Sequence, residues 1–126
     1  MPLSAFVAAI AIVFSAPAAA QLQRNFPQNA LRGEIQFGAP PEIVLNGRAV
    51  RLAPGARVRN QNNLLETTGA LAGQRAAVHY TLDLSGLVKD VWLLRPDELA
   101  KRPWPRTPQE ARSWSFDAVA QVWTPR

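Results

Sequence analysis

Ile43-Val44-Leu45-Asn46-Gly47-Arg48-Ala49-Val50 (IVLNGRAV) places an Asn-Gly pair between two runs of β-prone residues. A tight two-residue hairpin turn needs positive φ at both of its central residues, and Asn and Gly tolerate that conformation best. The segment therefore predicts a β-hairpin whose turn is Asn46-Gly47.

Short strands and turns continue on both sides of this hairpin, at intervals of roughly ten residues. Before it, apolar and polar residues alternate with the two-residue period of a half-buried strand. The predicted elements are a strand at 31–37, a turn at Ala53-Pro54-Gly55, a short strand at 57–59, a loop or single helical turn at 64–73, and a second hairpin of 75–82 and 87–94 around Asp83-Leu84-Ser85-Gly86. With no room for crossover helices, this pattern predicts a mainly β fold of five to six short antiparallel strands, a small barrel or sandwich rather than a parallel sheet.

The last part of the chain, residues 96–126, is a Pro- and Trp-rich extension of the β domain at 31–95. Thr107-Pro108-Gln109-Glu110 offers an N-cap Thr, a Pro at the first helical position and a Glu at the third, so a short helix is predicted there. The residues after it allow either more helix or an extended aromatic tail. Trp104, Trp114 and Trp123 give the extension a large aromatic area. This area either packs across an open edge or end of the barrel or offers a surface to a partner.

The first twenty residues predict export. An uncharged apolar run from Ala5 to Phe14 is followed by Pro17 and the small residues Ala18-Ala19-Ala20, as at a signal-peptide cleavage site. The run is shorter than the roughly 20 apolar residues that span a bilayer, so no transmembrane anchor is expected after cleavage. We therefore predict a signal peptide at 1–20, cleaved after about Ala20, a flexible leader at 21–30, and a periplasmic or secreted protein. The alternative is an amphipathic or buried N-terminal helix.

The chain is basic and free of cysteine. Fourteen Lys and Arg oppose nine Asp and Glu, and all of these cations except Lys89 and Lys101 are Arg, which binds phosphate and carboxylate in bidentate fashion. This balance indicates an anionic partner in the cell envelope. Alternatively, it reflects a GC-rich genome, whose codons favour Arg and Ala. Without Cys, neither disulfides nor thiol chemistry are available.

Four arginines are candidate binding residues, because the strand alternation turns them away from the apolar face: Arg48, Arg57, Arg59 and Arg75. If the strands that carry Arg48 and Arg57 are neighbours, the four form a cationic stripe for an anionic envelope polymer or lipid. Otherwise they belong to an ordinary solvated face. We expect no nucleic acid, because the predicted compartment disfavours it.

Familiar catalytic and cofactor motifs are absent from the sequence, which has no G-x-S-x-G, no P-loop, no G-x-G-x-x-G and no EF-hand loop. His79, the single histidine, lacks the usual companions of a soft-metal site, and we expect it to be exposed or on an edge strand. Asp83 and Asp90 flank the second hairpin turn, where they cap backbone amides or, in an enzyme, act with His79 as acid and base. We expect no cofactor, no metal and no catalysis.

Several segments together carry a resemblance to a known group of domains. They are Arg32-Gly33-Glu34-Ile35, Ile43 to Val50, Pro54 to Val58, Val78 and Leu87 to Trp92. In their order they resemble the small OB-like barrel domains of unknown function found in exported bacterial proteins, over about residues 31–95. The resemblance implies a small OB-like β-barrel, here with a short C-terminal helix or an extended aromatic tail, and carries over no activity.

The function expected from the sequence is therefore an exported, non-catalytic binding or interaction module of the periplasm or cell envelope. One alternative is a binder of anionic envelope polymer or lipid through the four arginines. The other is a small hydrolase-like enzyme that uses Asp83 and Asp90.

Overall fold

The hairpin at Asn46-Gly47 is present in the computed structural model, which describes residues 22–126. It joins β2 (Glu42–Leu45) to β3 (Arg48–Arg59), and Asn46 and Gly47 have φ values of 52° and 80°. The side-chain oxygen of Asn46 accepts a hydrogen bond from the backbone N–H of Glu34 at 2.9 Å, which ties the turn to a neighbouring strand. The predicted signal peptide at 1–20, together with Gln21, lies outside the described residues.

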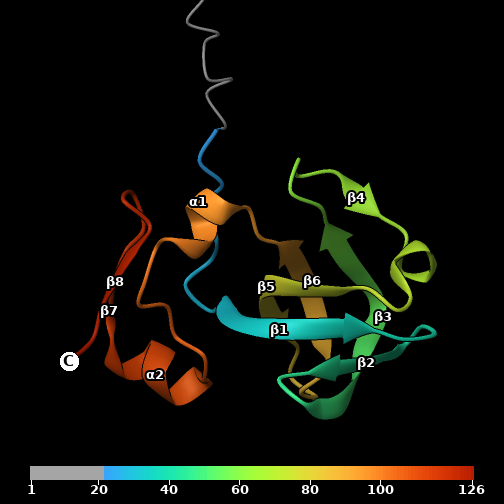
Figure 1. The fold of residues 1–126 in the computed structure, drawn as a ribbon. Helices are drawn as coiled ribbons and strands as arrows, with labels where there is room; N and C mark the ends of the chain where they lie inside the picture. The colour runs from blue at the N-terminus through green and yellow to red at the C-terminus, as the bar shows by residue number, and fades with distance from the viewer. Residues whose placement is uncertain (1–21) are drawn as a thin grey trace, which may run out of the picture.

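Five strands close into a small barrel (Figure 1). They are β1 (Leu31–Phe37), β2, β3, β5 (Arg75–Leu82) and β6 (Val88–Leu93). The order around the barrel is β2-β1-β5-β6-β3, and β2 pairs with β3 to close it. The prediction of a small β-barrel is confirmed, but one pair, β3 with β6, is parallel rather than antiparallel. A closed ring with an odd number of strands cannot alternate direction throughout, so one neighbouring pair has to be parallel.

β3 corrects the predicted turn at Ala53-Pro54-Gly55, because it runs through these residues as one strand of 12 residues. Gly55 has a φ of 76°, and the pairing with β6 shifts its register between Leu52 and Arg57. The Pro-Gly pair therefore makes a bulge that bends the strand instead of reversing it. The bend allows β3 to pair with β2 at its start and with β6 and the short β4 (Leu65–Glu66) at its end. The single helical turn predicted within 64–73 is the 3₁₀ helix η1 (Thr68–Leu71).

The barrel interior is filled by alternate residues of the strands, as the two-residue period predicted. Its buried members are Leu31, Ile35, Phe37, Ile43, Leu45, Leu52, Val58, Leu71, Val78, Tyr80, Val88, Val91 and Leu93. Every second residue of these strands therefore faces away from the interior, and that outer face carries the polar and aromatic groups described below.

The C-terminal extension lies on one side of the barrel (Figure 1) and contains α1 (Pro96–Leu99), α2 (Pro108–Ser113), β7 (Ser115–Asp117) and β8 (Val122–Thr124). α2 begins where the sequence predicts, since Thr107 Oγ1 accepts a hydrogen bond from the backbone N–H of Glu110 at 3.2 Å. The residues after α2 turn extended and form the β7–β8 hairpin. Within residues 22–126, no helix combines the length and apolar character required to cross a bilayer.

Residues 22–30 correct the prediction of a flexible leader. The segment runs between the extension and the barrel (Figure 1), with Phe26 and Ala30 only 5% and 0% exposed. Its polar, non-periodic sequence predicted disorder because the groups that hold it lie about 70 to 95 positions away in the chain. The N-terminal segment is thus part of the packed structure.

A substitution at Gly33 of β1 tests how closely the side chain of Asn46, in the hairpin turn, approaches this strand. A Cβ there would lie 2.8 Å from Asn46 Oδ1 and 3.0 Å from Tyr80 Cε1, so Gly33→Ala has to displace the Asn46 amide. We expect the free energy of unfolding to fall by about 1–3 kcal/mol in urea denaturation followed by circular dichroism. Gly69→Ala is the control, because no heavy atom lies within 4 Å of its Cβ position. Equal effects of the two substitutions would refute the steric explanation.

Candidate functional site

One row of outward-facing side chains crosses four strands of the barrel. Arg32 of β1 lies opposite His79 of β5, His79 lies opposite Trp92 of β6, and Trp92 lies opposite Arg59 of β3. The apolar residues beside them along each strand belong to the barrel interior: Leu31, Val78, Tyr80, Val91, Leu93 and Val58. The sheet register therefore places two guanidinium groups and two aromatic rings side by side on one outer face.

The N-terminal segment and the extension cover part of this row with a second apolar core, made of Phe26, Ala30, Leu94, Trp104 and Trp123. The Trp104 ring stacks on His79 with centroids 4.1 Å apart, and the edge of Phe26 meets His79 at 4.4 Å. Trp104 Nε1 also donates a hydrogen bond to the carbonyl of Ala30 at 2.9 Å. Trp104 and Trp123 are buried and Trp114 packs against them, so the interpretation in which the tail covers the barrel holds.

His79 is fully buried, which corrects the prediction of an exposed or edge-strand histidine. The alternation of the strand correctly predicted that His79 points away from the barrel interior. It could not show that a second layer of residues covers that outer face. Arg32 Nε donates to His79 Nε2 at 3.3 Å. Burial, together with the positive charges of Arg32 and Arg24, lowers the pKa of His79 to about 2, so the ring is neutral.

A buried ion cluster around Glu98 fastens the covering segments in place. Arg24 Nε donates to Glu98 Oε2 at 2.8 Å, and the backbone N–H of Arg95 donates to Glu98 Oε1 at 2.9 Å. The guanidinium of Arg32 donates to the carbonyls of Glu98 and Lys101, both at 2.9 Å, at the end of α1. The guanidinium of Arg95 pairs with Asp97 at 3.1 Å and with Glu98 at 3.6 Å. All three guanidinium groups therefore have partners within the fold.

Where the covering layer ends, an open groove of about 680 Å³ begins, which we call the amide groove. Arg59 and Trp92 form its sheet side. Side-chain amides from the N-terminal segment and from the loop after β3 form most of the remaining wall: Gln23, Asn25, Gln61, Asn62 and Asn63. Arg59 makes one long hydrogen bond, 3.4 Å to the carbonyl of Asn63, and no ion pair within residues 22–126. Its charge is therefore available to a ligand.

The other three candidate arginines are exposed but do not join Arg59 in one stripe. Arg57 is its neighbour on β3 and lies opposite Asp90 of β6. Arg48 occupies the far end of the same strand, and Arg75, at the start of β5, donates to Gln36 at 3.2 Å. The stripe fails because β3 is one bent strand, so Arg48 and Arg57 are not on neighbouring strands.

Of the two aspartates of the second hairpin, Asp83 caps backbone amides as the sequence allowed, whereas Asp90 bonds a side-chain hydroxyl. Asp83 Oδ1 accepts hydrogen bonds from the backbone N–H groups of Ser85 and Leu87 at 2.8 and 2.9 Å, which caps the turn. Asp90 Oδ2 accepts one from Thr81 Oγ1 at 3.0 Å. Within the described part of the chain, no three His, Asp or Glu side chains are grouped so that they could hold a metal ion.

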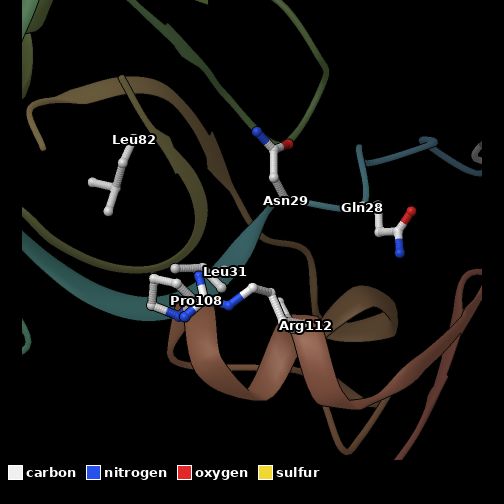
Figure 2. Close-up of a pocket in the computed structure, with 7 residues that line it drawn as sticks. Gln28, Asn29, Leu31, Leu82, Pro108 and Arg112 are labelled. Atoms are coloured by element: carbon white, nitrogen blue, oxygen red, sulfur yellow. The ribbon is translucent and has the colours of Figure 1, made fainter. Parts of the chain in front are cut away.

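A second groove, of about 590 Å³, lies between α2 and the barrel, and we call it the α2 groove (Figure 2). Its apolar lining comes from both structures: Leu31, Leu82, Pro108 and Ala111. Gln28, Asn29 and Arg112 supply its polar lining. The two grooves share no lining residue.

Sequence reasoning had named Arg59 but not its companions in the amide groove. The run Asn60-Gln61-Asn62-Asn63 was the one visible signal, because it places four consecutive side-chain amides directly after an outward-facing Arg. Nothing in the sequence indicated that Gln23 and Asn25 would complete the wall, because their position depends on the ion cluster.

Comparison with known proteins finds no matching family model, no matching curated protein and no matching solved structure. The functional argument therefore rests on the residues of this chain and their geometry.

The ion cluster predicts a large difference between two neighbouring acids. Glu98→Gln leaves Arg24 buried without its counter-ion, so we expect the free energy of unfolding to fall by about 3–5 kcal/mol. Asp97→Asn is the matched control, since the Asp97 side chain also bonds Arg95 but is 57% exposed, and we expect a loss under about 1 kcal/mol. Urea denaturation measures both values, and similar losses would contradict the role assigned to Glu98.

His79 predicts a specific dependence of stability on pH. Between about pH 6.5 and pH 2 the unfolded chain binds a proton at His79 that the folded protein excludes, so stability decreases as pH falls through this window. The contribution is up to about 1.4 kcal/mol per pH unit. His79→Gln removes it, so the slope of unfolding free energy against pH should flatten by this amount between pH 6 and 4. Parallel slopes for the two proteins would show that His79 titrates normally.

Proposed function

We propose that this chain is an exported, non-catalytic binding module of the periplasm or cell envelope, and that it holds an anionic saccharide polymer in the amide groove. The observation that carries the proposal is the pairing of Arg59 with Trp92 at the sheet side of that groove. The guanidinium of Arg59 has no ion-pair partner among residues 22–126, whereas Arg24 pairs with the Glu98 carboxylate and Arg32 bonds the Glu98 carbonyl.

The lining of the groove matches the three chemical features of such a polymer. Saccharide hydroxyls both donate and accept hydrogen bonds, and side-chain amides do the same. Trp92, half-buried against Phe26, offers a flat apolar surface with a polar edge for the ring of a sugar. A carboxylate on the polymer would pair with the guanidinium of Arg59, whose planar fork fits that group.

The strand arrangement supports the same proposal. The proposal takes the five-stranded barrel, with its one parallel pair between β3 and β6, as a member of the OB-like group that residues 31–95 resemble. OB-like barrels commonly bind oligosaccharides and oligonucleotides on an outer sheet face. Between these two, the predicted export favours the saccharide.

The predicted signal peptide and the charge balance narrow the ligand further. Outside the cytoplasm, the abundant polymers with carboxylates and phosphates belong to the cell envelope, and the formal net charge of +5 attracts them. The roles of Asp83 and Asp90 in the hairpin favour binding over hydrolysis.

The test uses residues 21–126 and two probes, oligogalacturonate and its neutral methyl ester, in calorimetric titrations. We expect the acid form to bind and the ester to bind about tenfold more weakly, because the ester cannot form the charged pair with Arg59. Binding of the acid should weaken at half-molar salt, which screens the exposed charge.

Substitutions locate the binding. Arg59→Gln should weaken binding of the acid about tenfold and leave the ester unaffected. Arg48→Gln is the control, because it removes the same charge from the same strand at its far end, where Arg48 is exposed and does not line the amide groove. Equal losses in the two variants would show that binding depends on net charge alone and would overturn the groove as the site.

A further inference from the structure

The α2 groove has an apolar floor built jointly by the barrel and the extension. Leu31 and Leu82 come from the ends of β1 and β5, and Ala111 comes from α2. Ala111 packs against both apolar cores, so the floor is fixed by the contact between them. A groove of about 590 Å³ formed in this way can take one apolar side chain together with the backbone that carries it.

The cationic side chain of Arg112 lines the same groove. Figure 2 shows the Arg112 side chain extending from α2 across the groove, toward Leu31 and Pro108. Arg112 makes no ion pair within residues 22–126. The one acid of α2, Glu110, is used at the other end of the helix, where it accepts from the backbone N–H of Arg106 and from Thr107 Oγ1.

The remaining wall is polar and carries no charge. Gln28 and Asn29 line it with side-chain amides, and both side chains are exposed. An amide both donates and accepts hydrogen bonds, which is what the N–H and C=O groups of a peptide backbone require. An acyl chain would offer these amides no partner.

We propose that the α2 groove binds the C-terminal end of a partner protein whose last residue is apolar. The terminal carboxylate pairs with Arg112, the last side chain lies on the floor of Leu31, Leu82 and Ala111, and the amides of Gln28 and Asn29 bond the peptide backbone. Capture of a chain end in this way combines one charged contact with one apolar contact, and each can be removed separately. The proposal is independent of the amide groove, which shares none of these residues.

The experiment is a calorimetric titration of residues 21–126 with two peptides. One is N-acetyl-Gly-Ser-Gly-Leu with a free C-terminal carboxylate, and the other is the same peptide as its C-terminal amide. We expect the acid to bind about tenfold more tightly than the amide, since only the acid pairs with Arg112. A third peptide, with Gly in place of the terminal Leu, should also bind more weakly than the parent acid, because it leaves the floor empty.

Arg112→Gln should weaken binding of the acid about tenfold and leave binding of the amide unchanged, so that the two peptides become equal. Arg59→Gln and Arg48→Gln are the controls, and both should bind the acid as the unmodified protein does. Arg112 is exposed, so Arg112→Gln should be as stable as the unmodified protein, and urea denaturation of each variant checks this.

Four results would overturn the proposal. Equal affinity for acid and amide in the unmodified protein would remove the role of the carboxylate, and an undiminished difference in Arg112→Gln would remove the role of Arg112. Absence of binding at millimolar peptide would remove the site for chain ends. Binding of dodecanoate that depends on Arg112, in place of the peptides, would instead assign the groove to an anionic amphiphile.

Discussion

The carboxylate of Glu98 is the point at which the N-terminal segment, the barrel and the extension are joined. An ionised carboxylate taken out of water costs several kcal/mol unless charged partners and hydrogen bonds offset that cost. Arg24 reaches it from the N-terminal segment, and Arg95 reaches it from the end of the barrel. Arg32 bonds the carbonyl of the same residue, so that three distant parts of the chain meet within one helical turn. Residues 22–30 and the C-terminal extension are thereby held against the outer face of the sheet.

This arrangement gives the small barrel a second apolar core on its outside. Phe26 and Trp104 cover His79, which becomes neutral and buried although it points away from the barrel interior. The covering layer stops short of Trp92 and Arg59, the last two members of the same row. The amide groove is therefore the uncovered end of a face that is otherwise closed, and its position follows from where the N-terminal segment crosses the sheet.

The positive charge of the chain is divided between these two settings. Inside the covering layer, the guanidinium groups of Arg24 and Arg32 bond Glu98 and the carbonyls at the end of α1, and so contribute to stability. Arg59 and Arg112 each stand at a groove without a counter-ion among the described residues. A net charge of +5 by itself distinguishes neither group, because it counts buried and exposed guanidinium groups alike.

Local chemistry allowed the sequence to determine the Asn46-Gly47 hairpin, the N-cap of α2 at Thr107 and the alternating barrel core, since each depends on residues a few positions apart. It also supplied Arg59 as a candidate. Only the tertiary structure decided that β3 bends without turning back, that residues 22–30 are packed, and which arginines remain free. Those outcomes depend on contacts between positions up to 95 residues apart, such as Phe26 with Gln121. A pattern of local periods contains no information about which distant segment covers an exposed face.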